Sequence, residues 1–257
     1  MKEQINLFLT ALQFFTRVPV SGLIRHHVDN LQKSARYFSW VGILTGGIGA
    51  IILYLSHKIF SPSLSIAFSM LATILITGAF HEDGFADCCD AFGGGWTKEK
   101  ILLIMKDSRL GTYGVVGLIG ILGFKFLLLQ ELFNHISLIQ LSAILLTGHS
   151  TSRFMALTIM QQYPYVQDID TSKSKPMANR KLNRVELAIA LTGALLPLVI
   201  LPVIYVGALL TVIFTRWCVG RYFYKWIGGY TGDCLGATQQ LCELIFYTSC
   251  LLLWKYI

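Results

Sequence analysis

The sequence predicts an all-α polytopic membrane protein with about seven transmembrane helices, and three observations favour this fold class. Of the 257 residues, 54% are hydrophobic and only 14% are charged, whereas a soluble domain carries about 25% charged residues. The apolar residues also form runs close to the ~20 residues that cross a bilayer. No linker rich in Pro, Gly or Ser divides the chain. We therefore expect one integral-membrane domain over residues 1–257, with its functional motifs at cytoplasmic helix ends and loops.

The apolar runs give the expected spans in chain order. They are Phe38–Ser56, Ser63–Phe80, Gly111–Phe133, Ile136–Met160, a longer run over Glu186–Phe214 that continues through Trp217–Trp226, and Ala237–Tyr256. Because prolines break helices, we expect the longer run to form two spans that meet near Pro202. Outside the spans, Ile5–Phe15 is predicted to lie along the interface as an amphipathic helix or to pack on the bundle. Thr97–Met105 is predicted to form a short surface helix capped by Thr97.

The positions of Lys and Arg predict how the chain is oriented in the membrane. With the N-terminus in the cytoplasm and seven crossings, the cytoplasmic side receives four polar segments: residues 1–36, 81–110, 161–185 and 228–236. These segments and the adjoining helix ends hold most of the basic residues, while the opposite side has little beyond Lys58 and Lys255. This distribution follows the positive-inside rule. We expect a multi-pass protein of the cell inner (cytoplasmic) membrane with its active face in the cytoplasm.

The net charge of +7 arises mostly in these loops. It favours membrane lipid and phosphate as partners, and the sequence lacks the alternation of aromatic and basic residues that would indicate nucleic acid. Ionisable residues also fall inside the predicted spans, where a charge is costly, so they should face the bundle interior or an interface. These residues are Lys125, His149, Arg153 and Arg216.

Four carboxylates lie close together in His81–Asp90, directly after an apolar run. The chain has only 14 acidic residues, and Glu82, Asp83, Asp87 and Asp90 all belong to this stretch. On a helix, Asp83, Asp87 and Asp90 share one face because they are spaced i, i+4 and i+7. Like charges at this spacing repel, so we expect a hard cation such as Mg²⁺ among them. A solvated acidic loop between two helices is the alternative.

Glycines follow or flank acidic residues at two places. Gly93, Gly94 and Gly95 would end the first helix and let the backbone approach a phosphate. Gly232 precedes Asp233 at the expected cytoplasmic entrance of the last span, where a helix N-terminus also favours phosphate. We expect these glycines to bind substrate and Asp233 to be an additional metal ligand. A flexible turn with a capping Asp would also explain the second motif.

Basic and titratable side chains complete the expected site. Arg109 is expected to bind a phosphate through a bidentate contact, and Asp107 either joins the metal site or pairs with Arg109. Arg153 is a candidate substrate contact within its span. His81 is a candidate general base, because the pKa of histidine can be tuned near neutrality, although a lone histidine more often serves as a hydrogen-bonding partner.

Four motifs resemble those of one family. His81–Gly95 closely resembles the signature of the cobalamin synthases, or adenosylcobinamide-GDP ribazoletransferases. Asp107–Gly114, Thr231–Ala237 and, near the start, Phe14–Pro19 are similar to other motifs of that family. Length, hydropathy and the order of the motifs agree across the whole chain. The segment Gln161–Arg184 matches least.

The resemblance implies a membrane transferase that joins adenosylcobinamide-GDP to α-ribazole or its 5′-phosphate. The products would be adenosylcobalamin or its phosphate, and GMP, in the last steps of cobalamin nucleotide-loop assembly. The ribazole 3′-hydroxyl would attack the phosphorus next to the cobinamide arm.

The resemblance also implies roles for individual residues. Mg²⁺ is the implied cofactor, held on the pyrophosphate by four ligands: Asp83, Asp87, Asp90 and Asp233. Arg109 would bind a phosphate, and the catalytic candidates are Glu82, Asp83 and His81. The sequence leaves open whether the protein forms a homo-oligomer.

Two other function classes remain compatible with the residues. A CDP-alcohol phosphotransferase, another Mg²⁺-dependent membrane enzyme, also carries Asp residues near Gly along its helices, but Asp87 lies where the motif of that family has Arg. A divalent-cation transporter would place acidic residues at the middle of the membrane, whereas the predicted cluster lies at a helix end.

Overall fold

The structure, a computed structural model, describes residues 2–25, 27, 29–166 and 180–256. These residues form helices and no β-strand, apart from one isolated bridge between Tyr165 and Tyr230. The α-helices are α1 (Lys2–Phe15), α2 (Asn30–Ser34), α3 (Phe38–His57), α4 (Pro62–Thr77), α5 (Phe80–Gly94), α6 (Lys98–Met105), α7 (Thr112–His135), α8 (Leu138–Gln162), α10 (Arg184–Leu195), α11 (Ala208–Ile227) and α12 (Gly232–Leu253). The 3₁₀ helices are η1 (Ser21–Leu23), η2 (Ala35–Tyr37), η3 (Leu196–Ile200), η4 (Val203–Gly207) and η5 (Trp254–Tyr256).

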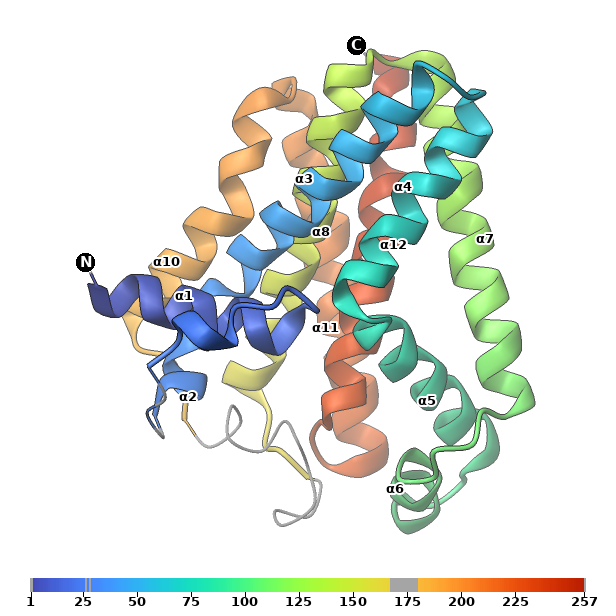
Figure 1. The fold of residues 1–257 in the computed structure, drawn as a ribbon. Coiled ribbons are helices and arrows are strands. Elements are labelled where there is room, and N and C mark those ends of the chain that lie inside the picture. The colour runs from blue at the N-terminus through green and yellow to red at the C-terminus, as the bar shows by residue number, and fades with distance from the viewer. Residues whose placement is uncertain (1, 26, 28, 167–179, 257) are drawn as a thin grey trace.

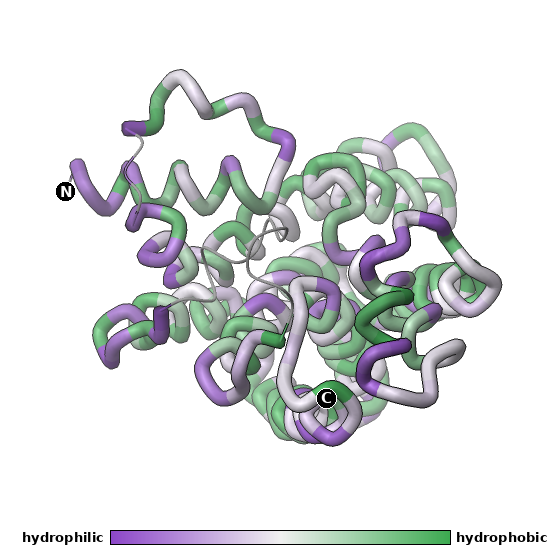
Figure 2. The backbone as a smooth tube through the Cα atoms, turned by 90° about the horizontal axis from the view of Figure 1, so that it is seen from below, coloured by the Kyte–Doolittle hydropathy of each residue, from purple (hydrophilic) through white to green (hydrophobic). Residues whose placement is uncertain are grey.

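The long helices run back and forth between two ends of the molecule (Figure 1). One end holds four groups of described residues: 2–36 without 26 and 28, 81–110, 161–166 with 180–185, and 228–236. We call it the polar end. Seen from below, hydrophilic residues mark its loops and helix ends (Figure 2). The prediction that the polar segments share one side is thus confirmed for the described residues; Lys173 and Lys175, and the turn at Ser174–Pro176, lie outside them.

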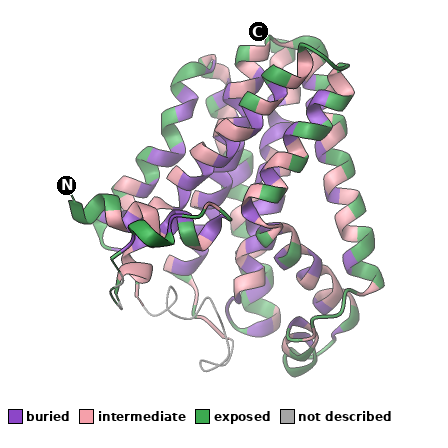
Figure 3. Ribbon diagram, in the orientation of Figure 1, coloured by how far each residue is buried: buried purple, intermediate pink, exposed green. Residues whose placement is uncertain are grey.

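Several helices are suited to a membrane. Among the described residues, three segments are long and apolar enough to cross one: Asn30–His57, Thr112–His135 and Val203–Ile227. A fourth results if α4 and α5 form one span bent by 88°. The prediction of an all-α polytopic membrane protein is confirmed, and the number seven stays a prediction. The remaining expected spans are helices too, but α10 has only 12 residues, and α8 and α12 carry many buried polar residues (Figure 3).

The long apolar run after residue 186 divides as expected. α10 and η3 lead to Leu201 and Pro202, where the helical backbone is interrupted, and η4 and α11 follow. Leu201 has an extended backbone with ψ of 149°, as is typical of a residue before proline. The predicted break near Pro202 is confirmed, and Val203–Ile227 after it is long and apolar enough to cross a membrane; that the part before it is also a span stays a prediction.

The predicted span Ser63–Phe80 was too long, because the helix ends at Thr77. The chain then turns through Gly78 (φ 68°) and Ala79 (φ 58°), both left-handed, and α5 leaves at 88° to α4. The side chain of Arg17 covers this turn: a Cβ on Gly78 would lie 2.2 Å from Arg17 Nε. The backbone N–H of Arg17 donates to the Ile76 carbonyl at 2.7 Å. The turn directs α5, with its carboxylates, under the bundle.

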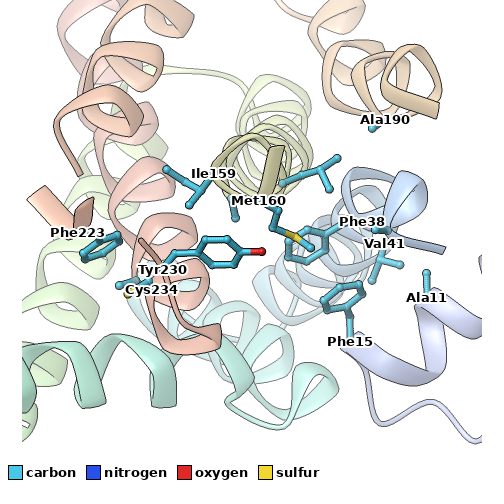
Figure 4. Close-up of a cluster of buried hydrophobic side chains, with 14 of the residues drawn as sticks. Ala11, Phe15, Phe38, Val41, Ile159, Met160, Ala190, Phe223, Tyr230 and Cys234 are labelled. Atoms are coloured by element: carbon cyan, nitrogen blue, oxygen red, sulfur yellow. The ribbon is translucent and has the colours of Figure 1, made fainter. Parts of the chain in front are cut away.

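Small residues let the central helices pack closely. A Cβ on Gly42 of α3 would lie 2.4 Å from the His149 carbonyl oxygen of α8, and one on Gly46 would lie 2.8 Å from Leu146 Cα. Such close approach is common between helices in membranes. Near the polar end, aromatic side chains fill the space between α1, α3, α8 and α12 (Figure 4). Phe15 stacks on Phe38 with ring centroids 4.1 Å apart.

We predict that Gly78→Ala lowers the free energy of unfolding by about 1–2 kcal/mol, because a Cβ is strained at a positive φ and would also displace Arg17. Thermal unfolding in detergent micelles measures the effect. Gly47→Ala is the matched control, since a Cβ there meets nothing within 4 Å. Equal stability of the two variants would contradict the role assigned to the turn.

Candidate active site

Helices α5 and α12 cross at the polar end with little space between their backbones. A Cβ on Gly84 would lie 3.0 Å from the Cα of Asp233, and one on Gly236 would lie 3.0 Å from the His81 carbonyl oxygen. These distances are shorter than ordinary van der Waals contacts, so a side chain does not fit at either position without a shift of the helices. The two glycines therefore bring the acidic face of α5 against the first turn of α12.

Three carboxylates from two distant motifs gather at this crossing: Asp83, Asp87 and Asp233, here called the acidic cluster. Asp83 is exposed, whereas Asp87 and Asp233 are half-buried. Burial and then the charge of Asp233 raise the pKa of Asp87 to about 7. Burial and the charge of Asp83 raise the pKa of Asp233 to about 6. The neighbouring carboxylates thus oppose the ionisation of Asp87 and of Asp233.

Asp90, the last member of the predicted acidic face, contacts the start of α7. Its Oδ2 accepts a hydrogen bond from the Gly111 N–H at 2.7 Å, and its Oδ1 accepts one from the Gly114 N–H at 2.8 Å. Both amides belong to the first turn of a helix, where they lack partners within the helix and where negative charge is stabilised. The structure thus shows Asp90 joining α5 to α7. Its role as a metal ligand stays a prediction.

The acidic cluster fits a divalent cation that a substrate helps to hold. Among the described residues, no group of three His, Cys, Asp or Glu side chains converges closely enough to bind a metal without a substrate. Mg²⁺, however, commonly takes only one or two carboxylates and completes its shell with phosphate oxygens and water. Burial, followed by the charge of neighbouring carboxylates, raises the pKa values of Asp87 and Asp233, and a cation bound there would favour their ionised forms. The identity of the metal and its ligands stays a prediction.

Arg109 lies on the surface of the polar end with its side chain 88% exposed. Its Nη2 donates to Asp107 Oδ2 at 2.6 Å and its Nε to Oδ1 at 3.0 Å. These hydrogen bonds hold the pKa of Asp107 down to about 2. Of the two roles expected for Asp107, the structure shows the pairing with Arg109. An exposed ion pair contributes little stability, so Arg109 can exchange Asp107 for a phosphate.

The predicted substrate-binding glycines mark helix ends. α5 ends at Gly94, as predicted, and Gly95 continues in an extended conformation. Gly93 packs on a ring, because a Cβ there would lie 2.6 Å from Tyr113 Cγ. Gly232 begins α12, and the Thr231 hydroxyl caps that helix by accepting from the Cys234 N–H at 3.3 Å. Substrate binding by Gly93, Gly94, Gly95 and Gly232 stays a prediction.

Three other candidates face the bundle interior. His81 is 2% exposed. Glu82 Oε1 accepts a hydrogen bond from Gln240 Nε2 at 2.9 Å, and its Oε2 is buried without a partner. Arg153 is 1% exposed and donates to the His149 carbonyl at 2.9 Å. Arg153 therefore lies in the bundle interior, which is one of the two positions expected for it; the other was an interface. Its role as a substrate contact stays a prediction, and so do the catalytic roles of His81 and Glu82.

Sequence reasoning missed a buried polar network centred on Glu243, which is 3% exposed. Lys125 Nζ donates to Glu243 Oε1 at 3.0 Å and to Gln240 Oε1 at 2.6 Å. His149 Nδ1 lies 3.2 Å from Glu243 Oε2. The sequence did contain a signal for this network, namely the polar pair Gln240 and Glu243 inside an apolar run. Polar residues within a span need polar partners there. Through Gln240 the network reaches Glu82 and so fixes the inner side of α5.

Comparisons with known proteins place these features in one family. The family model described as cobalamin-5-phosphate synthase matches residues 7–251. The chain is 45% identical to the adenosylcobinamide-GDP ribazoletransferase of Shewanella frigidimarina, covering 95% of this chain and 94% of the relative. The enzyme of the same name from Vibrio parahaemolyticus is 41% identical, with 100% and 96% covered.

The chain belongs to the cobalamin-5-phosphate synthase family. As a member of this family it is a transferase of cobalamin biosynthesis. The match spans α1 to α12, so the acidic cluster, Asp90 and the network around Glu243 all lie inside it. No solved structure matches the chain.

We predict that Gly236→Ala lowers turnover by about 10- to 100-fold, because a displacement of about 1 Å between α5 and α12 would separate Asp233 from Asp83 and Asp87. The rate of product formation by purified protein measures this. Gly120→Ala, in α7, is the control, since a Cβ there meets nothing within 4 Å. Similar rates for the two variants would show that the close crossing is not needed.

We predict that Mg²⁺ affinity rises between about pH 5.5 and 7.5, by up to about tenfold per unit for each proton released, because Asp87 and Asp233 must lose protons to bind a cation. The stability of the metal-free protein should change with pH in the opposite direction to the Mg²⁺ affinity. The pKa values of both groups lie above their ordinary value of 3.8, so the free energy of unfolding should fall as pH rises from about 4 to about 7. Melting temperatures with and without Mg²⁺ across this range test both trends. A Mg²⁺ effect that does not change with pH would contradict the assignment.

Proposed function

We propose that the protein joins adenosylcobinamide-GDP to α-ribazole or its 5′-phosphate, with release of GMP, and that Mg²⁺ assists the transfer. The relatives carry the name adenosylcobinamide-GDP ribazoletransferase. The observation that supports this most is the meeting of Asp83 and Asp87 from α5 with Asp233 from α12 at one end of the molecule. A pyrophosphate needs a concentration of positive charge, which carboxylates supply by holding a cation.

In the proposed reaction the ribazole 3′-hydroxyl oxygen attacks the phosphorus bonded to the cobinamide arm. A new P–O bond forms, the P–O bond to the GMP phosphate breaks, and GMP leaves with the electron pair. Asp87 and Asp233 would hold Mg²⁺, which neutralises the pyrophosphate and stabilises the leaving phosphate. Asp83 is the exposed carboxylate of the cluster, and we assign to it the proton of the attacking hydroxyl.

Arg109 and α7 complete the proposed site. Arg109 is an exposed cation of the polar end, in the segment between α6 and α7, and a guanidinium binds phosphate oxygens in pairs. Asp90 holds the first turn of α7 against α5 through the Gly111 and Gly114 amides. We assign to Asp90 the positioning of the segment that carries Arg109.

Glu82 receives a positioning role in this proposal in place of direct metal binding. Its Oε1 accepts from Gln240, and its side chain faces the network around Glu243 rather than the acidic cluster. Within the described part of that network, Lys125 pairs with Glu243, and Oε2 of Glu82 is the carboxylate oxygen left without a partner, whereas a divalent-cation transporter would need several open carboxylates in the middle of the membrane. This arrangement favours the transferase over the transporter.

We propose further that the polar end faces the cytoplasm across the inner membrane. The described segments at this end include most of the basic side chains that flank the helices, as the positive-inside rule requires for a cytoplasmic face. Nucleotide substrates and Mg²⁺ are available there. Incubation of the purified protein with adenosylcobinamide-GDP, α-ribazole 5′-phosphate and Mg²⁺ should release GMP and form the cobalamin phosphate. Absence of both products from folded protein would overturn the proposal.

We predict that Asp83→Asn and Asp233→Asn each lower the rate of GMP release by about 100- to 1000-fold or more, because each removes a charge that acts on the reacting phosphates. Glu131→Gln is the matched control, since Glu131 pairs only with the exposed His135 on its own helix among the described contacts. Membrane insertion and melting temperature should stay close to wild type in all three. Near-normal turnover of either Asp variant would remove that residue from the proposed site.

A further inference from the structure

An enclosed cavity of about 30 Å³ lies at the polar end, beside the first turn of α12. Gly232 and Gly236 form its floor on α12, on either side of Asp233 in the sequence. Its walls are mainly aromatic and come from four helices and the connections near them: Phe14, Phe15, Phe38, Phe80, Tyr165 and Tyr230. We call this space the aromatic cavity. It adjoins the acidic cluster without containing any of its carboxylates.

His81 supplies a hydrogen-bonding nitrogen to the wall of the aromatic cavity. Its side chain is 2% exposed, and its Nε2 has no hydrogen-bond partner among the residues that the structure describes. Phe38 stacks parallel to the imidazole with ring centroids 5.9 Å apart, and Phe80 meets it edge-on at 5.5 Å. Tyr230 contributes a hydroxyl that points toward Met160 and Phe38 (Figure 4). A buried nitrogen without a partner is destabilising, so a ligand that pairs with it gains affinity.

A cleft of about 570 Å³ opens to the surface directly outside this cavity. Phe14 and Phe80 line both spaces, and their rings meet edge to face with centroids 5.9 Å apart. The cleft is lined by apolar and polar side chains and contains Arg17, an exposed residue whose guanidinium lies over Gly78. We call it the N-terminal cleft. Two aromatic rings therefore separate a basic, open cleft from a closed apolar cavity.

We infer that the cleft and the cavity together bind the nucleotide acceptor, with its planar base in the aromatic cavity and its 5′-phosphate at Arg17. This inference rests on the proposed function, since it assigns one of the two proposed substrates to a place. The base packs against the wall that the stacked rings of Phe15, Phe38 and His81 form, and an unsubstituted ring nitrogen pairs with His81 Nε2. The ribose then lies at the pair Phe14 and Phe80.

The chemistry of the wall selects a benzimidazole over a guanine. Guanine presents several donors and acceptors along its edges, and burying them without partners is costly. The polar side chains in the wall of the aromatic cavity are few: His81, Tyr165 and Tyr230. A benzimidazole, with one free ring nitrogen and an apolar second ring, leaves no polar atom unpaired there. The guanine of the other substrate accordingly binds elsewhere.

Entry of the base requires the aromatic cavity to widen. Its volume of about 30 Å³ exceeds the roughly 10–15 Å³ that one water needs, but it is too small for a bicyclic base. Phe80 is 41% exposed, so its ring can turn toward the N-terminal cleft and open the way. Binding of the acceptor thus moves Phe14 and Phe80 apart and joins the two spaces.

Equilibrium binding of α-ribazole and of α-ribazole 5′-phosphate to the purified protein tests the inference. We expect His81→Phe to raise the Kd for both by about tenfold or more, because a site that pairs a polar atom loses affinity when the partner is removed. Tyr230→Phe, which removes only a hydroxyl, should raise both by a few-fold. His57→Phe is the matched control, because His57 also has a buried nitrogen without a partner but lies at the other end of the molecule. Arg17→Gln should weaken binding of the phosphate form alone.

Competition identifies the base. Free benzimidazole should displace α-ribazole from the wild-type protein, and guanosine should not. Equal α-ribazole affinity of His81→Phe and His57→Phe, or displacement by guanosine in place of benzimidazole, would overturn the inference. A change in KM for adenosylcobinamide-GDP, with KM for α-ribazole unaltered, would do the same. If the wild-type protein binds α-ribazole but releases no GMP, the proposed function fails while the binding result still decides the cavity.

Discussion

The close crossing of α5 and α12 is the contact on which the rest of the site depends. Gly84 and Gly236 let the two backbones approach until no side chain fits between them. Asp83 and Asp87 lie far from Asp233 in the sequence. Only the close approach of the two helices brings these carboxylates together. The repulsion among these carboxylates opposes the crossing. The fold must therefore hold α5 in place by contacts on its other sides.

These contacts lie on two sides of α5, one toward the bundle interior and one toward α7. On the inner side, Glu82 meets Gln240, and the network of Lys125 and Glu243 fixes that glutamine within the bundle. Buried charges of this kind persist when each is paired, because an unpaired charge in a low-dielectric interior is far more costly. On the outer side, Asp90 accepts a hydrogen bond from the backbone N–H of Gly111 at the start of α7. The strongly polar interior of a membrane bundle thus serves to position one helix.

Much of the fold and part of the site followed from local patterns. Apolar runs located the helices, the prolines located the break near Pro202, and glycine located the end of α5 at Gly94. The turn at Ala79 could not be foreseen, because alanine gives no signal for a left-handed conformation. The pairing of Lys125 with Glu243 depends on two helices far apart in the sequence, and spacing within one segment cannot reveal it. For the same reason Asp90 was grouped with the other carboxylates although its oxygens contact α7.

The contact of Asp90 with α7 has a topological consequence. Gly114 lies 24 positions after Asp90, so this one side chain closes a loop that contains α6 and Arg109. A loop closed at its base has lost most of the conformational entropy that an open segment of the same length would keep. The enclosed segment is therefore tied to α5 at both of its ends, by the backbone after Gly94 and by the Asp90 carboxylate. One carboxylate thus sets both the position of α7 and the reach of the segment that carries Arg109.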